Sequence, residues 1–305
     1  MSPTLLILAA GMGSRYGGLK QFDRFGPSGE TIMDYAVYDA LAAGFTRVVF
    51  VIRHEFESDF RKLVGSKYEN RVAVDYVFQE LDDLPAGFRA QAGRAKPWGT
   101  AHAIWCARLR VNEPFLSVNA DDYYGKNAYK LAAQHLMRPP SAGIPEYCLV
   151  GYPVLQTLSE YGGVVRAICD LDDAGFLKGL VERAKLEKSG ATGRYPDENG
   201  TMCILGGNEV VSMNMLGFEP SVFAGLERCL TRFLEGQQKK PDNSECLIPV
   251  ALGELLKEKA ARVRVLPTSD RWFGVTHADD KPGVVANLRA MVESGEYPSP
   301  IWKMA

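Results

Sequence analysis

The chain has 305 residues, of which 46% are hydrophobic and 24% are charged, and its formal net charge is −2. This length predicts one large α/β domain or two smaller ones, and the charge argues against nucleic acid or an anionic membrane as a partner. The apolar run that follows Met1 is too short for a membrane helix and lacks the basic start of a secretory signal. The six cysteines are scattered without a CxxC pair, which argues against a zinc or redox motif and favours the cytoplasm.

The first quarter of the chain alternates between strand-like and helix-like segments. Residues 4–10, 46–52 and 72–78 are mainly apolar, as in parallel strands that are buried on both faces. Between them, 31–43 has the apolar spacing of a helix and is followed by Gly44 at a C-cap position, and 55–65 predicts a second helix. The order β-α-β-α-β predicts a doubly wound α/β sheet.

The rest of the chain predicts a loop, two further helices and more strands. Residues 80–98 are polar and contain Pro and Gly, which predicts a loop. A helix is expected over about 100–110, and strands over 114–120, 146–154, 163–172 and 209–218. The polar, Gly-rich segment 187–208 predicts poor order. A final helix is expected over about 281–294, with Asp280 as its N-cap and Pro282 in its first turn.

The segment LLILAAGMGSRYGGLKQF (5–22) combines a strand, several glycines and the cations Arg15 and Lys20. Free backbone N–H groups at such a strand–glycine–helix junction bind phosphate. Two common phosphate loops do not match: a GxGxxG fingerprint would need glycine in place of Tyr16, and a P-loop would need Lys directly after Gly18. The alternative is an ordinary tight turn with two solvated cations.

The motif AAGxGSR followed by Lys resembles the opening of the sugar-phosphate nucleotidyltransferases, and related cytidylyl- and guanylyltransferases open similarly. Gln79, WGTAHAIWCAR (98–108) and NEPFLSVNADDYYG (112–125) are similar to segments of UTP–glucose-1-phosphate and N-acetylglucosamine-1-phosphate uridylyltransferases. The resemblance spans residues 5 to about 280 and implies a Rossmann-like, doubly wound mixed sheet flanked by helices, of the nucleotide-diphospho-sugar transferase type. It implies a single domain, 1–305, with a nucleotide-binding half (1–125), a sugar-phosphate-binding half (126–276) and a C-terminal helix and tail (277–305).

The resemblance also implies an activity and its residues. An NTP, expected to be UTP, would condense with a sugar 1-phosphate and release pyrophosphate, with Arg15 and Lys20 facing the phosphates as catalytic cations. His102 by itself is expected to be a packed or capping side chain rather than a catalyst. The implied nucleotide-binding residues are Ala10, Gly11, Gly13, Ser14, Gln79, Gly99 and Thr100, of which Gln79, Gly99 and Thr100 would read the pyrimidine base.

Asp121 is the expected catalytic metal ligand. It follows a predicted parallel strand, where ligands bind in open α/β sheets, and a carboxylate suits Mg²⁺. Asp122 would point elsewhere and act as a cap or a supporting group, and a solvated turn is the alternative for both. Many relatives supply a second metal carboxylate from Trp-x-Asp-x-Gly, but here Gly274 stands at that Asp. Alignment to the Gly-Val-Asn of other relatives makes Thr276 the implied second oxygen ligand, with Asp279 as the backup.

Three downstream segments resemble the sugar site of the family: YGGVV (161–165), GLVER (179–183) and SMNMLGF (212–218). Arg183 stands where a Lys usually contacts the sugar phosphate, which keeps the charge but changes its geometry. The alternative for each segment is an ordinary sheet edge. The implied sugar-phosphate-binding residues are Gly163, Glu182, Arg183 and Asn214.

Two other functions remain open at this point. A phosphocholine cytidylyltransferase would need aromatic and acidic groups for the quaternary cation, and Tyr161 with Glu182 would serve. A regulatory subunit would bind a nucleotide sugar without catalysis, but the presence of Arg15, Lys20 and Asp121 together argues against it. The expected partners are an NTP and a sugar 1-phosphate, with no nucleic acid and no membrane. The sequence leaves open whether the chain forms a homo-oligomer.

Overall fold

The computed structural model of the chain describes residues 2–11, 23–91, 93–141, 143–159, 162–239, 243–274 and 280–302. The strands are β1 (Thr4–Leu8), β2 (Arg47–Ile52), β3 (Ala73–Phe78), β4 (Phe115–Asn119), β5 (Asp122–Tyr123), β6 (Glu146–Pro153), β7 (Val164–Leu171), β8 (Leu177–Ser189), β9 (Thr192–Pro196), β10 (Met202–Leu205), β11 (Val210–Phe218), β12 (Arg262–Pro267) and β13 (Phe273–Gly274). The helices are α1 (Ile32–Ala43), α2 (Glu57–Leu63), α3 (Thr100–Cys106), α4 (Lys126–Leu136), α5 (Val222–Lys239), α6 (Ile248–Lys257) and α7 (Lys281–Glu293).

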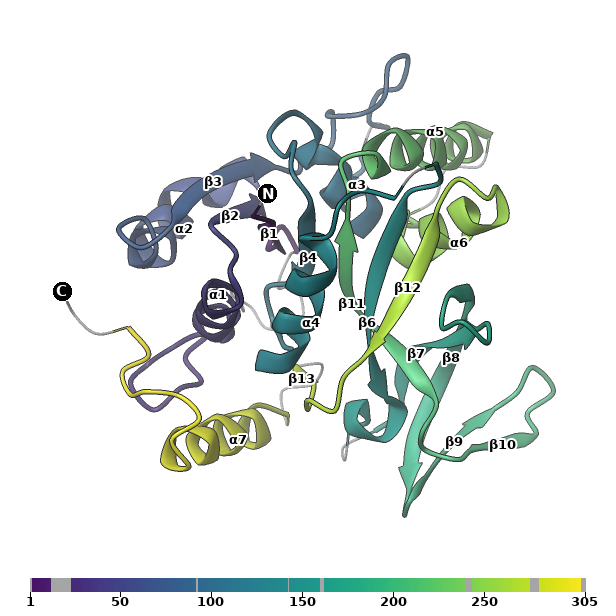
Figure 1. The fold of residues 1–305 in the computed structure, drawn as a ribbon. Helices are drawn as coiled ribbons and strands as arrows, with labels where there is room; N and C mark the ends of the chain where they lie inside the picture. The colour runs from purple at the N-terminus through teal and green to yellow at the C-terminus, as the bar shows by residue number, and fades with distance from the viewer. Residues whose placement is uncertain are drawn as a thin grey trace.

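Within the described residues, eleven strands form one mixed sheet with helices on both faces (Figure 1). The strand order is β10-β9-β8-β7-β11-β4-β1-β2-β3, and β6 and β12 extend the sheet from the other edge of β11. Strands β3, β2, β1 and β4 are parallel, whereas β11 runs antiparallel to β4, β6 and β7. The arrangement confirms the predicted α/β mixed sheet.

Strand β1 shows why the N-terminal apolar run is uninterrupted. Leu5 and Ile7 belong to the core that also holds residues of α1, α2 and α4, whereas Leu6 belongs to the core on the α3, α5 and α6 side. Alternate side chains of a strand point to opposite faces, so a central strand with helices on both sides is apolar at every position. The strand ends at Leu8, two residues before the predicted end.

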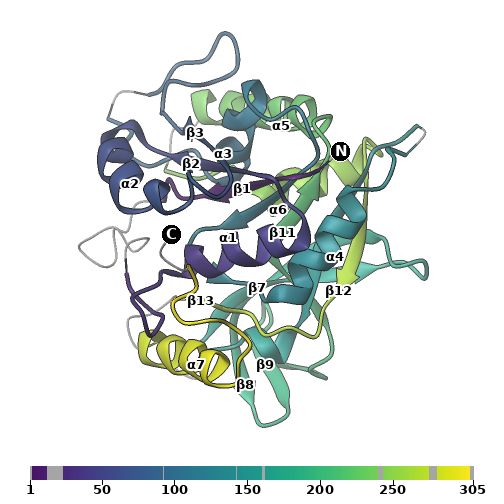
Figure 2. The ribbon, with the colours of Figure 1, turned by 60° about the vertical axis from the view of Figure 1, so that its left-hand side comes forward.

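Helix α1 has strong signals at both ends. Thr31 is its N-cap and forms a capping box with Asp34, and Gly44 caps the other end with φ of +100°. The C-terminal segment packs against this helix: Val284 and Leu288 of α7 lie in one apolar cluster with Tyr35. Figure 2 shows α7, in yellow, below α1.

The prediction of poor order over 187–208 is wrong. The segment forms two successive antiparallel pairings, β8 with β9 and β9 with β10, and Gly190 and Gly200 lie in the connecting turns with positive φ (Figure 1). Ile204 is 75% exposed, whereas Tyr195 and Leu205 pack against the core, so one face of this part of the sheet lies in solvent. The polar composition therefore reflects exposure and not the absence of structure.

The start of α7 also differs from its prediction. Asp280 occupies the N-cap position and Pro282 lies in the first turn, but the Asp280 side chain forms no capping hydrogen bond. Its Oδ1 accepts a hydrogen bond from Ser159 Oγ at 3.1 Å instead. No helix in the described ranges is long and apolar enough to cross a membrane.

Candidate functional site

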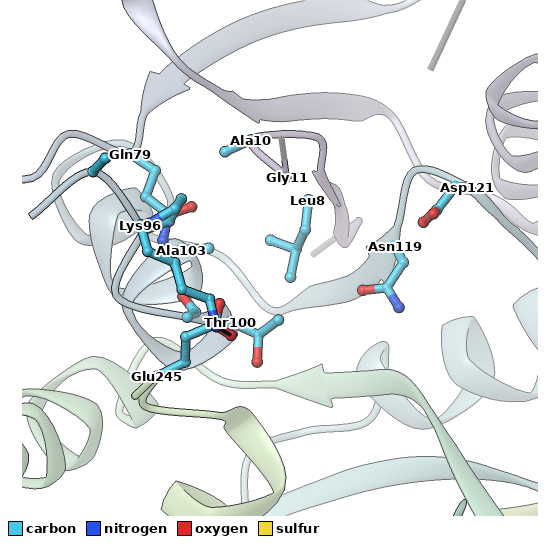
Figure 3. Close-up of a pocket in the computed structure, with 13 residues that line it drawn as sticks. Leu8, Ala10, Gly11, Gln79, Lys96, Thr100, Ala103, Asn119, Asp121 and Glu245 are labelled. Carbon is cyan, nitrogen blue, oxygen red and sulfur yellow. Dashed lines mark hydrogen bonds and ion pairs between the residues drawn. The ribbon is translucent and has the colours of Figure 1, made fainter. Parts of the chain in front are cut away.

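A cavity of about 530 Å³ lies at the carboxyl ends of β1 and β4 (Figure 3). In open α/β sheets, ligands bind at this edge, where the loops after the strands converge. The walls come from the end of β1, the residue after β3, the loop before α3 with its first turn, the end of β4, and one residue before α6. The lining residues are Leu8, Ala10, Gly11, Gln79, Ala95, Lys96, Pro97, Gly99, Thr100, Ala103, Asn119, Asp121 and Glu245.

Residues predicted from widely separated motifs meet in this cavity. Those that line it are Ala10, Gly11, Gln79, Gly99, Thr100 and Asp121. A Cβ added to Gly11 would meet no described atom within 4 Å. The predicted residues Gly13, Ser14, Arg15, Lys20, Tyr161, Thr276 and Asp279 lie outside the described residues.

Three polar residues of the cavity were not predicted. Asn119 stands two positions before Asp121 at the end of β4, and strand alternation could have indicated it. Lys96 and Glu245 form an ion pair at 2.7 Å, with both side chains partly exposed. Glu245 comes from a loop 149 residues further along the chain than Lys96, so no local motif could have indicated it.

The turn before α3 is fastened to the segment before α6. Cys246 donates its backbone N–H to the Trp98 carbonyl at 2.7 Å, and Thr100 Oγ1 accepts the backbone N–H of Ile248 at 2.9 Å. Gly99 has φ of +102°, and a Cβ there would lie 2.6 Å from the Cys246 carbonyl oxygen. Glycine is therefore required at position 99 both by its backbone conformation and by this close approach.

The Gln79 side chain also contacts the turn before α3. Its Nε2 lies 3.0 Å from the Gly99 carbonyl oxygen and 3.2 Å from Nδ1 of His102. His102 is fully buried, and its Nε2 lies 2.6 Å from the Asp83 carbonyl oxygen. Burial lowers the pKa of His102. The ring is therefore a packed, neutral group behind the cavity wall, as the sequence suggested.

Asp121 lines the cavity, and Asp122 is held behind it. Asp122 Oδ2 accepts hydrogen bonds from Asn119 Nδ2 at 2.9 Å and from the Tyr124 hydroxyl at 3.2 Å. Burial, together with the nearby charge of Asp121, raises the pKa of Asp122 to about 7. Asp122 thus supports the end of β4.

Gly274 lies directly opposite Asp122 in the β5–β13 pair. A Cβ on residue 274 would stand 2.4 Å from Oδ1 of Asp122. A second carboxylate at residue 274 is therefore incompatible with the present position of Asp122. No cluster of three or more His, Cys, Asp or Glu side chains suited to a metal occurs in the described part of the chain. The oxygen donors at this edge, the Asp121 carboxylate above all, fit Mg²⁺ if substrate phosphates and water complete its coordination.

Asn214 lies in a bulge of β11. The pairing of β11 with β6 shifts register between Ser212 and Leu216, and Asn214 has φ of +60°. The Tyr124 hydroxyl, which lies 3.2 Å from Asp122 Oδ2, also lies 3.1 Å from the Met213 carbonyl oxygen, and its one hydrogen can be directed to either. The residue before Asn214 in the bulge thus contacts the tyrosine that contacts Asp122.

The predicted pair on β8 is divided between two faces of the sheet. Arg183 pairs with Arg166 and Glu182 pairs with Ala167, and consecutive strand residues face opposite sides. Among the other predicted residues, Gly163 is closely approached: a Cβ there would lie 3.0 Å from Lys185 Cα.

Arg166 is a buried cation near the aspartates that was not predicted. Its Nε donates to the Thr157 carbonyl oxygen at 3.1 Å, and its guanidinium lies 4.9 Å from the centre of the Trp272 ring. Burial lowers the pKa of Arg166 to about 10, and the charges of Asp122 and Asp280 act in the opposite direction. Its place within the apolar run GVVRAIC was the available sequence signal.

Comparison with known proteins agrees with this geometry. A sequence profile described as nucleotidyl transferase matches residues 4–262. The chain belongs to the nucleotidyl transferase family. This confirms the predicted transferase enzyme and the family resemblance.

Individual relatives of this nucleotidyltransferase are distant. It is 24% identical over 229 residues to the low-salt glycan biosynthesis nucleotidyltransferase Agl11 of Haloferax volcanii. The aligned region covers 73% of this chain and 51% of that protein. The chain thus spans about half the length of that relative. HddC from Yersinia pseudotuberculosis has a TM-score of 0.57 at 14% identity, covering 95% of this chain and 100% of that one. A UDP-glucose pyrophosphorylase complexed with UDP-glucose has a TM-score of 0.60 at 18% identity, and the match covers 94% of this chain and 98% of that one. At these identities the two structures show a shared fold.

Proposed function

We propose that this nucleotidyltransferase condenses UTP with a sugar 1-phosphate to give a nucleotide sugar and pyrophosphate, in the cytoplasm and with Mg²⁺. The observation that supports this most is the cavity in which Gln79 and Gly99 lie on one side and Asp121 on the other. A base, a ribose and a triphosphate need such a span between a polar wall and a carboxylate. The names of the glycan-biosynthesis relative and of the pyrophosphorylase structure agree with a sugar nucleotide as product.

In the proposed reaction an oxygen of the sugar phosphate attacks the α-phosphorus of the triphosphate. The bond between the α-phosphorus and the bridging oxygen breaks, and pyrophosphate leaves from the opposite side. The protein forms no covalent bond, so positioning and charge stabilisation provide the rate enhancement. Arg15 and Lys20 would offset the charge on the departing pyrophosphate. Mg²⁺ bound by Asp121, with Thr276 as the proposed second protein ligand, would supply additional charge neutralisation between the phosphates.

The two parts of the chain would divide the substrates between them. Residues 1–125 would bind the nucleotide and 126–276 the sugar phosphate, with 277–305 as a C-terminal helix and tail. On the sugar side, Arg183 shares a sheet face with Arg166, whose charge interacts with Asp122. Asn214 and the backbone of Gly163 would complete this side. Glu182 lies on the other face, which gives no support to a pocket for phosphocholine.

A matrix of four NTPs against several sugar 1-phosphates and phosphocholine, read by pyrophosphate release, tests this proposal. We expect the highest rates with UTP or dTTP and a sugar 1-phosphate. Asp121→Asn should abolish most of this activity, whereas Asp173→Asn, a matched change at an exposed turn residue, should leave it unchanged. Equal rates with ATP and UTP, or transfer to phosphocholine alone, would contradict the proposal.

A further inference from the structure

The side-chain amide of Gln79 has a defined orientation. Its nitrogen lies 3.0 Å from the carbonyl oxygen of Gly99. A carbonyl oxygen only accepts hydrogen bonds, so the amide atom that faces it must be the N–H₂ group and not the oxygen. The Gly99 contact therefore assigns the two ends of the amide from hydrogen-bond chemistry.

The second amide hydrogen is directed by His102. Nε2 of His102 lies 2.6 Å from the carbonyl oxygen of Asp83, so Nε2 carries the ring hydrogen. The ring is fully buried, and burial lowers its pKa, which keeps it neutral. Nδ1 is then an acceptor, and it lies 3.2 Å from the Gln79 nitrogen. Both amide hydrogens of Gln79 thus have acceptors.

The carbonyl that sets the His102 tautomer is itself held in place. The Asp83 carboxylate accepts hydrogen bonds from Arg108 at 2.7 and 3.1 Å. Two residues earlier, the Leu81 carbonyl accepts the indole N–H of Trp98 at 2.9 Å. The 80–83 segment is therefore anchored from two sides, and its position determines which ring nitrogen of His102 faces Gln79.

These bonds leave the Gln79 oxygen, Oε1, as the amide atom available to a ligand. Gln79 lines the cavity, and none of the hydrogen bonds found among the described residues involves Oε1. An acceptor in that place pairs with an N–H of the base. Where Oε1 faces ring N3, it accepts the N3 hydrogen of uracil or thymine and is repelled by N3 of cytosine, whose only base-edge hydrogens are on the 4-amino group.

We propose that His102 is a positioning residue that fixes the Gln79 amide with its oxygen toward the cavity, and that the enzyme thereby selects uracil or thymine over cytosine. This inference rests on the proposed function, because it places a nucleotide base beside Gln79. His102 touches no substrate and acts through Gln79.

Two substitutions separate the two hydrogen bonds of His102. His102→Asn keeps an acceptor near the position of Nδ1, facing Gln79, but loses the donor to Asp83. His102→Gln keeps a donor near the position of Nε2 but loses the acceptor for Gln79. We expect the UTP-to-CTP ratio of kcat/KM to stay near the wild-type value in His102→Asn. In His102→Gln the ratio should fall about tenfold or more, because loss of a buried hydrogen bond that leaves one group unpaired changes the free energy by that amount. A role limited to holding the 80–83 loop predicts the reverse order.

The loop itself supplies the control. Asp83→Ala removes the Arg108 contact but keeps the backbone carbonyl that His102 uses, so the base ratio should stay within about twofold of wild type. Wild-type discrimination by a folded His102→Gln protein, or a wild-type preference for CTP, would overturn the inference while leaving nucleotidyl transfer intact. Absence of pyrophosphate release with every NTP would instead overturn the proposed function.

A measurement on the unmodified protein covers the case in which the variants do not fold. Long-range ¹H–¹⁵N spectra of the four histidines, with His102 assigned by elimination of the other three, report the ring tautomer directly. We expect a neutral ring with its hydrogen on Nε2 at pH 7. A hydrogen on Nδ1 would overturn the inference, because Nδ1 would then donate and could not receive the Gln79 amide hydrogen.

Discussion

Replacement of Gly274 by Ala tests the close packing between β13 and Asp122. The added Cβ would lie 2.4 Å from Asp122 Oδ1 and 3.0 Å from the Trp272 ring, both shorter than van der Waals contact. Overpacking of this kind costs about 1–3 kcal/mol, which corresponds to a fall in Tm of about 2–5 °C in a protein of this size. The matched control is Gly253→Ala in α6, where a Cβ meets nothing within 4 Å. Its Tm should be unchanged or slightly higher, because Ala favours the helix.

A double-mutant cycle shows whether Asp122 is the cause. In an Asp122→Ala background the carboxylate oxygen is gone, so Gly274→Ala should cost less there than in the wild type, by about 0.5–3 kcal/mol in urea unfolding. The Trp272 contact remains in both backgrounds and cancels. If the two changes add within about 0.5 kcal/mol, the conflict with the carboxylate does not exist and the reasoning is refuted.

Three further predictions concern the reaction and the stability. Lys20→Ala should lower kcat by about 100-fold with little change in Tm, because it removes charge stabilisation of the departing phosphates; wild-type turnover would contradict the role. Asp121→Asn should lower activity steeply and recover little with added Mg²⁺, whereas Thr276→Ala should mainly raise the Mg²⁺ concentration required; a metal titration of both distinguishes them. Burial raises the pKa of Asp39 from 3.8 to about 7, so the native state retains this proton and wild-type stability should decrease as the pH rises from about 4 to about 7. Asp39→Asn should flatten that decrease in urea unfolding, and an unchanged pH profile would show that Asp39 is not its source.

The parts of the fold that follow local rules could be predicted from the sequence. Helix α1 was expected because its apolar spacing ends at Gly44, and the structure gives that glycine the left-handed conformation of a C-cap. The apolar strands β1 and β2 were expected because helices on both faces leave no polar position. By contrast, α4, α5, α6 and β12 were not predicted. Strands β9 and β10 were missed because they are short and largely exposed, and only single side chains such as Tyr195 and Leu205 pack against the core.

The site residues also separate into those that a local feature or the family resemblance indicates and those that depend on long-range pairing. Asp121 could be placed because a strand end is a local feature, and Gln79 and Gly99 because the family resemblance names them. Glu245 could not, since it reaches the cavity through long-range pairing of the chain. Arg166 stood out only as a cation within an apolar run, and that run does not show which groups the cation faces. The opposite faces of Glu182 and Arg183 follow from strand alternation, but their partners on β7 depend on the pairing register, which the sequence around them does not define.

The contacts of the C-terminal segment offer a way to observe its packing against α1 without an added label. Trp302 donates its indole N–H to Asp34 Oδ1 at 3.0 Å, and Lys281 pairs with Asp23 Oδ2 at 3.0 Å, just after the glycine-rich segment. Indole fluorescence responds to the loss of such a hydrogen bond and to exposure to water. The chain has four tryptophans, so replacing the other three with Phe would make Trp302 a built-in fluorophore. Its emission would then report whether substrate binding disturbs the contact between the C-terminal segment and α1.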